Sequence, residues 1–168
     1  MPAETLSLQH LERLAAERQL LLRLQVRRSL GLFTALRVGV AARQADDGLR
    51  LLGELKGWAL PRADGLRLDT MRVQGEGSQG VGLLIWAATF AWALEATPCR
   101  TARLLAIRDG ERQHRRLVRY FEGLGFRPLR PLGAAPLDLP QRLLWGGAGL
   151  LMQADCAEGL RRCARRLG

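Results

Sequence analysis

One segment of the sequence limits the possible folds more than any other. From Leu83 to Leu94 almost every residue is apolar, within an uncharged stretch of 15 residues that begins at Gly80. A helix of this kind has no polar face to turn toward water, so the rest of the chain must cover it on every side. It is shorter than the roughly 18–20 residues that span a bilayer, so we expect a buried central helix and no membrane contact.

Length and composition agree with one globular domain. The chain has 168 residues, 48% of them hydrophobic and 25% charged, which excludes disordered, collagen-like and disulfide-stapled classes of protein. We expect a single domain over 1–168, with an N-terminal helix region at 1–30, a core at 31–154 and a C-terminal helix at 155–168. Glu4 and Glu12 stand where an export signal would be apolar, so the expected location is the cytoplasm.

The cysteines and histidines predict no metal or redox site. Cys99, Cys156 and Cys163 include no C-x-x-C pair, and His10 and His114 lie far apart in the sequence. Because this set has no zinc-ligand spacing, three free thiols in a reducing compartment are the simplest interpretation.

Positive charge is concentrated in the second half of the chain. The formal net charge is +10, and every basic residue except Lys56 is an arginine. One helical stripe is a candidate contact surface for an acidic protein partner or a phosphate, and a solvated helix face explains it equally: Arg112, Arg115, Arg116 and Arg119. A nucleic-acid-binding module is the least favoured class, because no aromatic residues alternate with the arginines to stack on bases.

Hydrophobic periodicity predicts the elements. Helical spacing indicates a helix from Ser7 to Arg27, although Leu20–Val26 also alternates like a first strand. Alternation and turn residues then predict strands at Phe33–Ala42, Leu49–Ala59 and Leu66–Val73, the helix at Leu83–Leu94, a strand at Arg103–Ile107, a helix at Glu111–Leu124, a strand at Leu143–Met152 and a helix at Asp155–Leu167. A meander followed by mixed elements places the chain in the α/β or α+β class.

A glycine-rich loop, Gln74–Gly82, joins the meander to the apolar helix. Glycine lets the backbone approach a ligand closely, and the first N–H groups of a helix attract anions such as pyrophosphate. The Walker A motif needs a lysine in this loop, and the only lysine is Lys56, which excludes P-loop chemistry. The Rossmann fingerprint needs a parallel βαβ unit, which the preceding meander does not provide.

The order of these elements resembles the GCN5-related N-acetyltransferases, the GNAT superfamily. The resemblance rests on a strand ending at Val73, the loop Gln79-Gly-Val-Gly82, the apolar helix, a strand, and a helix that ends Tyr-Phe-Glu-Gly-Leu-Gly-Phe126. It covers roughly Phe33 to Met152.

The resemblance implies a mixed sheet splayed around a cleft for acetyl-CoA. The strand at Met71–Val73 would pair with the pantetheine arm, and the loop amides at Gln79–Leu83 would hold the pyrophosphate. The residues that the resemblance implies for cofactor binding are Met71, Arg72, Val73, Ser78, Gln79, Gly80, Val81, Gly82, Leu83, His114 and Phe121.

The loop departs from the family pattern Q/R-x-x-G-x-G/A. With Gly80 and Gly82 as the paired glycines, the Gln/Arg position falls on Gly77. Gln79 is one polar substitute, and a match shifted to begin at Gln74 is another.

The second helix departs from the pattern Y-x-x-x-G-F. Phe121 stands where the family often has a tyrosine that protonates the leaving thiolate, and His114 stands where it often has asparagine. Tyr120 is the next residue, about 100° round the helix, so we expect it not to fill the same place. Cofactor binding is therefore better supported than turnover.

Acetyl transfer to an amine needs a base, for which Asp69 is the first candidate. Period-two alternation predicts that Asp69 shares a strand face with Met71 and Val73, toward the cofactor. The alternative is a carboxylate paired with Arg67 or Arg72.

Glu54 and His114 are the other base candidates, and His114 is expected to face solvent because arginines surround it in sequence. Tyr120 or a water is the candidate acid. The leading hypothesis is an acetyl-CoA-dependent N-acetyltransferase acting on a primary amine by direct transfer. The alternative is a catalytically degenerate GNAT-fold protein that senses CoA or binds a protein partner.

Overall fold

The computed structural model describes residues 6–73, 80–108, 110–133 and 148–168. Its elements in chain order are α1 (Leu8–Glu17), β1 (Leu20–Ser29), β2 (Phe33–Arg43), β3 (Leu49–Ala59), β4 (Leu66–Val73), α2 (Val81–Ala96), β5 (Thr101–Ile107), α3 (Glu111–Gly123), β6 (Arg127–Leu132), β7 (Gly149–Asp155) and α5 (Cys156–Leu167).

The strands form one mixed sheet in the order β1-β2-β3-β4-β5-β7-β6. The first four strands are an antiparallel meander, β4 and β5 are parallel, and β5, β7 and β6 are antiparallel. The expected mixed α/β class is therefore confirmed.

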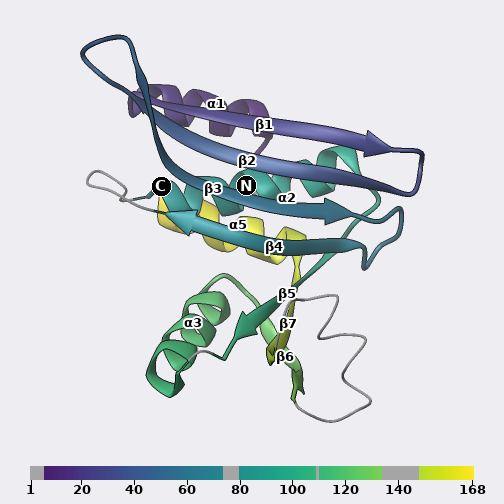
Figure 1. Ribbon diagram of the computed structural model, residues 1–168. Coiled ribbons are helices and arrows are strands. Elements are labelled where there is room, and N and C mark those ends of the chain that lie inside the picture. Colours follow the sequence, from purple (N-terminus) through teal and green to yellow (C-terminus); the bar gives the residue numbers. More distant parts are fainter. Residues whose placement is uncertain (1–5, 74–79, 109, 134–147) are drawn as a thin grey trace.

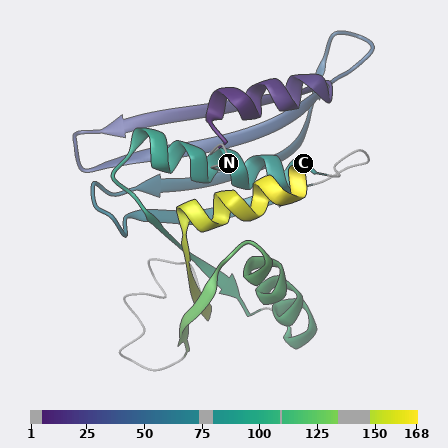
Figure 2. The same ribbon diagram turned by 180° about the vertical axis from the view of Figure 1, so that it is seen from behind.

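Three helices lie on one face of the meander. Figures 1 and 2 show α1, α2 and α5 side by side behind β1–β4, with α3 set apart beside β5. In the described part of the chain no helix covers the opposite face of these four strands. The sheet is thus covered on one side and open on the other.

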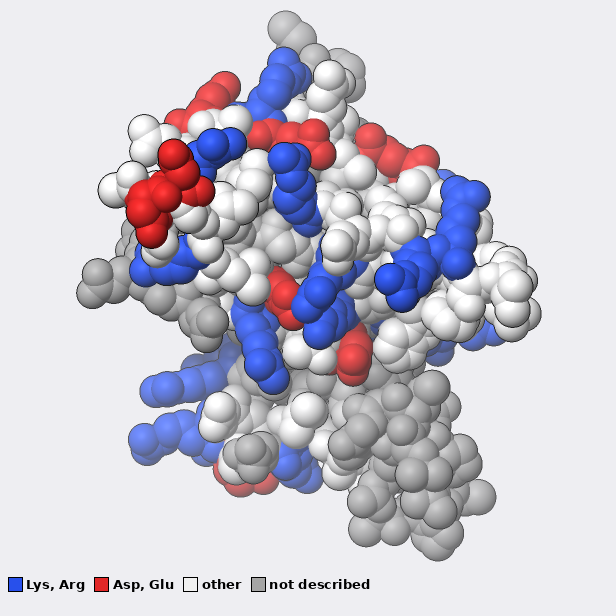
Figure 3. Space-filling view, turned by 45° about the horizontal axis from the view of Figure 1, so that its top comes forward, with Lys and Arg blue, Asp and Glu red and all other residues white. Residues whose placement is uncertain are grey.

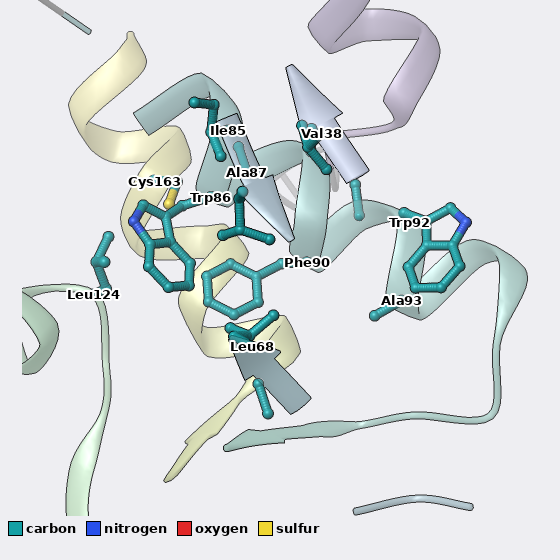
Figure 4. Packing of buried hydrophobic residues seen from close by; sticks show 14 of the residues in the cluster. Val38, Leu68, Ile85, Trp86, Ala87, Phe90, Trp92, Ala93, Leu124 and Cys163 are labelled. Atoms are coloured by element: carbon teal, nitrogen blue, oxygen red, sulfur yellow. The ribbon is translucent and has the colours of Figure 1, made fainter. Parts of the chain in front are cut away.

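The apolar helix is buried as its composition requires. Trp86, Phe90 and Trp92 of α2 are each at most 4% exposed, which confirms the expectation that the helix is surrounded. Figure 4 shows Phe90 near Leu68 of β4, and Trp86 turned toward Cys163 of α5. Thr89 is the buried hydroxyl residue of α2, and its side chain donates a hydrogen bond to the Ile85 carbonyl at 2.8 Å.

The predicted helix Ser7–Arg27 is wrong beyond Glu17. Ser7 caps α1 by accepting the His10 N–H at 3.1 Å, but the backbone reverses at Gln19, whose φ is 61°. The strand alternative is confirmed, because β1 pairs along its whole length with β2. The ten residue pairs of this hairpin stabilise the strand more than a longer amphipathic helix would be stabilised by burying its one apolar side.

The later elements match the sequence pattern, apart from one strand. Asp155 caps α5 by accepting the Glu158 N–H at 2.9 Å, and Gly125 follows α3 with a φ of 102°. The pattern did not place β6, which carries two prolines at the sheet edge. The predicted strand Leu143–Met152 is seen from Gly149 onward, and residues 143–147 lie outside the described part.

The described residues contain neither a membrane-spanning helix nor a cluster of metal-binding side chains. No helix among them is long and apolar enough to cross a membrane. No group of three or more His, Cys, Asp or Glu side chains among them is placed to hold a metal ion.

Gly159 sets the distance between α2 and α5. A Cβ at this position would lie 2.6 Å from ring carbons of the buried Phe90. We therefore expect Gly159→Ala to destabilise the fold by about 1–3 kcal/mol in urea unfolding, because the core cannot accept the added carbon. Arg165→Ala, at an exposed position of α5, is the control and should cost about 0.5 kcal/mol or less. Equal effects of the two substitutions would contradict this packing argument.

The buried thiols predict a loss of stability at alkaline pH. Burial raises the pKa of Cys156 and Cys163 from 9.0 to about 12. Between these values the unfolded chain releases thiol protons that the folded chain retains, so the unfolding free energy falls as pH rises, by up to about 1.4 kcal/mol per pH unit for each thiol. In urea titrations across this range, Cys163→Ala should make the decline shallower, and an unchanged slope would show that other groups cause it.

Candidate functional site

The sheet opens at a bulge in β4. Along β3, Lys56 pairs with Thr70 and the next residue, Gly57, pairs with Leu68, so Asp69 is an extra residue with no partner across the ladder. Such a bulge bends its strand. The parallel pairing of β4 with β5 ends at Leu68, the residue just before the bulge. Figure 1 shows β4 and β5 diverging in direction.

The bulge also reverses the expected direction of Asp69. Met71 packs against the core on the helix side, and Val73 lies toward Gly82 of α2. Asp69 instead is exposed and lines a hollow on the open face with Lys56. The prediction that Asp69 shares a face with Met71 and Val73 is therefore wrong, because the extra residue shifts the alternation by one.

The N-terminus of α2 lies beside this opening. Gly80 precedes the helix in the left-handed conformation, with φ of 78°, and its carbonyl accepts the first helical N–H, from Leu84, at 3.0 Å. The N–H groups of Val81, Gly82 and Leu83 come before that bond, and no acceptor for them lies in the described residues. Ser78 and Gln79, which were predicted to bind the cofactor, lie outside the described residues, as do Gln74 and Gly77.

Three elements meet at Gly82. A Cβ there would lie 3.2 Å from the Tyr120 hydroxyl and 3.5 Å from Cε of Met71. The absence of a side chain at this position lets α2 approach both β4 and α3. A larger residue would collide with the Tyr120 hydroxyl and displace it.

Tyr120, and not Phe121, is the α3 residue whose side chain ends beside Gly82, in the first turn of α2. Its hydroxyl accepts a hydrogen bond from Nε1 of Trp86 at 3.0 Å. The ring of Phe121 is buried, with ring centroids 6.1 Å from Trp86 and 5.9 Å from Phe126. The helix rotation that buries Phe121 therefore turns Tyr120 to the opening, contrary to the expectation from the spacing.

The environment of Tyr120 favours its protonated form. Burial raises the pKa of the phenol, and the hydrogen bond from Trp86 opposes that effect without cancelling it. Because the hydroxyl oxygen accepts from Trp86, its own proton remains available to donate.

His114 has a structural contact that the sequence did not indicate. It is 8% exposed, so the expectation that it faces solvent is wrong. Its Nδ1 lies 3.2 Å from the Ile107 carbonyl, and a carbonyl can only accept, so Nδ1 carries the proton. This bond fixes α3 to the end of β5.

Glu54 is held by cations. Its carboxylate accepts from Nε of Arg37 at 3.2 Å and lies 3.5 Å from Nζ of Lys56. The Arg37 hydrogen bond is the main cause of a lowered pKa at Glu54, so this carboxylate is a poor proton acceptor.

Asp69 does not form the predicted pair with Arg67 or Arg72. Arg67 is buried and donates to the carbonyls of Asp64 and Leu66. Within the described residues the Asp69 carboxylate has no ion pair, and it remains the base candidate that faces solvent.

Part of the arginine stripe lines a hollow together with Tyr120. This hollow of about 800 Å³ runs along α3 and is lined by Arg112, Arg116 and Tyr120 among others. All four predicted arginines, including Arg115 and Arg119, are exposed. With Glu111 also in its lining, the hollow carries a net positive charge on the same side of α3 as Tyr120.

Comparison with known proteins gives no assignment. No protein-family model matches the chain, and no curated protein matches it. The geometry described above is therefore the basis for any functional conclusion.

The contact between Trp86 and Tyr120 can be tested by a double-mutant cycle. Tyr120→Phe leaves a buried indole N–H without its acceptor and should cost about 1–2 kcal/mol of unfolding free energy in urea. In a Trp86→Phe background the same substitution should cost much less, because the donor is already gone. An equal cost in both backgrounds would rule out the hydrogen bond.

Proposed function

We propose that this protein is an acetyl-CoA-dependent N-acetyltransferase with a GNAT-like fold, acting on a primary amine by direct transfer. The observation that carries the proposal is the opening of the sheet at Asp69, beside the α2 N-terminus and the Tyr120 hydroxyl. A strand order of β1-β2-β3-β4-β5-β7-β6 is compatible with the family resemblance in the sequence.

The residues at the opening fit the chemical groups of acetyl-CoA. Beyond Leu68 the β5-facing edge of β4 has no ladder partner in the described residues, and an extended chain with amides can pair with such an edge. Met71, Arg72 and Val73 supply that edge for a pantetheine arm. The N–H groups at Val81–Leu83 and the helix dipole suit a pyrophosphate.

Two side chains have the properties that the proton transfers need. When bound, acetyl-CoA supplies an acetyl thioester, whose C–S bond breaks as the amine nitrogen forms the amide bond. Asp69 takes the proton that the ammonium group loses, directly or through water, and Tyr120 holds the proton that the leaving thiolate needs. Tyr120 can hold this proton because a tyrosine phenol is protonated at neutral pH and its hydroxyl oxygen, which accepts from Trp86, leaves the O–H free to donate.

A CoA-binding protein without catalytic activity is the second candidate, because Phe121 occupies the position at which the family often has tyrosine. The two candidates share cofactor binding and differ in turnover. They therefore require a binding measurement followed by a transfer measurement.

Calorimetric titration with acetyl-CoA and CoA tests the shared part. We expect one site of micromolar affinity and a loss of at least tenfold in Gly82→Val, whose side chain would collide with Tyr120 and Met71 and displace the first turn of α2. Gly39→Val is the matched control, because a Cβ there meets nothing nearer than 3.7 Å. Absence of binding by the wild-type protein would refute both candidates.

The transfer step then separates the two candidates. If the protein is an enzyme, release of free CoA will require an amine, and Tyr120→Phe will lower kcat about 100-fold while changing acetyl-CoA affinity little. Binding without amine-dependent CoA release across a broad amine panel would favour the inactive CoA-binding protein.

A further inference from the structure

The open face of the sheet carries a row of basic side chains. The register aligns one residue from each of the seven strands, in the order Arg27, Ala35, Trp58, Arg67, Arg103, Gln153 and Arg127. Four of these seven residues are arginines, on the side away from α2. Figure 3 shows Lys and Arg side chains gathered over this part of the molecule, with acidic ones between them.

A hollow of about 600 Å³ lies on this face at the meander. Gln25, Ala35, Trp58 and Asp69 contribute to its lining, together with the cations Arg27, Arg37 and Lys56. This volume is in the range of small-ligand sites. Asp69 is the bulge residue, so the hollow adjoins the place where β4 leaves β5.

Cations outnumber carboxylates in the lining of the hollow. Asp69 is its only carboxylate among the described lining residues, against three cations. Arg37 and Lys56 share a single carboxylate, that of Glu54, so together these three side chains leave positive charge toward the hollow. Trp58, which is half-buried and also lines the hollow, adds an apolar wall.

We propose that this hollow binds the amine acceptor, and that the acceptor is an amine with a carboxylate close to it, as in an acidic amino acid or the free N-terminus of an acidic peptide. The ammonium group would face Asp69 and the carboxylates would face Lys56, Arg37 and Arg27. The proposal rests on the proposed acetyltransferase function, for which it names the substrate class.

A polynucleotide fits this face less well. Trp58 is the only aromatic side chain in the row, and base binding on a sheet needs successive stacking partners. Arg67, at the centre of the row, is 6% exposed and donates to backbone carbonyls, so it offers little to a phosphate chain.

The test uses matched probes in the presence of CoA at physiological salt. C-terminally amidated Gly-Asp-Asp and Gly-Asn-Asn differ only in their carboxylates, and aspartate against asparagine provides the same pair as free amino acids. We expect the acidic member of at least one pair to bind about tenfold more tightly by calorimetry. If only the peptide pair shows this difference in affinity, the acceptor is a peptide. If only the amino-acid pair shows it, the acceptor is a free amino acid.

Variants locate the preference in the hollow. Lys56→Gln should weaken the acidic probe about fivefold to tenfold and leave the neutral probe unchanged, while Asp69→Asn should weaken both probes because each has the amine. Arg23→Gln is the control, because Arg23 is an exposed cation of β1 that does not line the hollow. Equal losses in Lys56→Gln and Arg23→Gln would indicate general electrostatic attraction and overturn the proposal.

The outcomes separate this inference from the function on which it rests. Tight acetyl-CoA binding with no preference for acidic probes would overturn the acceptor class and leave the acetyltransferase proposal standing. If the protein prefers acidic probes but does not bind acetyl-CoA, both proposals are overturned: the hollow is not an acceptor site, and the protein is not an acetyltransferase. Tighter, Lys56-dependent binding of a short oligonucleotide would also overturn the acceptor class, in favour of a polyanion surface.

Discussion

The burial of α2 is the constraint on which the rest of the structure depends. The helix is apolar on all sides, so it can exist in water only if strands and helices enclose it. The meander covers one side, and α1 and α5 cover others, with Gly159 allowing α5 to approach Phe90. Because α1, α2 and α5 lie on this face and α3 packs beside β5, no helix in the described part covers the opposite face of the meander. That face stays open and carries basic side chains.

A single extra residue in β4 gives this sheet its second important property. The bulge at Asp69 coincides with the end of pairing to β5, and it directs Asp69 and Met71 to opposite faces. The opening therefore has a helix side, with Gly82 and Tyr120, and an open side, with Asp69 and Lys56. In the proposed function, acetyl-CoA would enter from the helix side and the amine from the open side. The two substrates would then meet at the opening.

Much of the fold could be predicted from local patterns, and the exceptions have identifiable causes. Alternation gave β2, β3 and β4, and the apolar run gave α2, because each pattern is a property of neighbouring residues. The helix predicted to Arg27 was wrong because a ten-pair hairpin with β2 competes with helical propensity there. β6 was not placed because its prolines and exposed arginines do not alternate like a buried strand.

For the site, the sequence by itself determined the glycine-rich segment, the apolar helix that follows it, and Asp69 and Tyr120 as the candidate base and acid. Tertiary structure alone decided which way these side chains point. The face of Asp69 depends on a bulge in the pairing with β3, and the position of Tyr120 depends on the rotation of α3 that buries Phe121 against Trp86. Register and helix rotation are set by contacts between residues far apart in the chain, so no local pattern contains them.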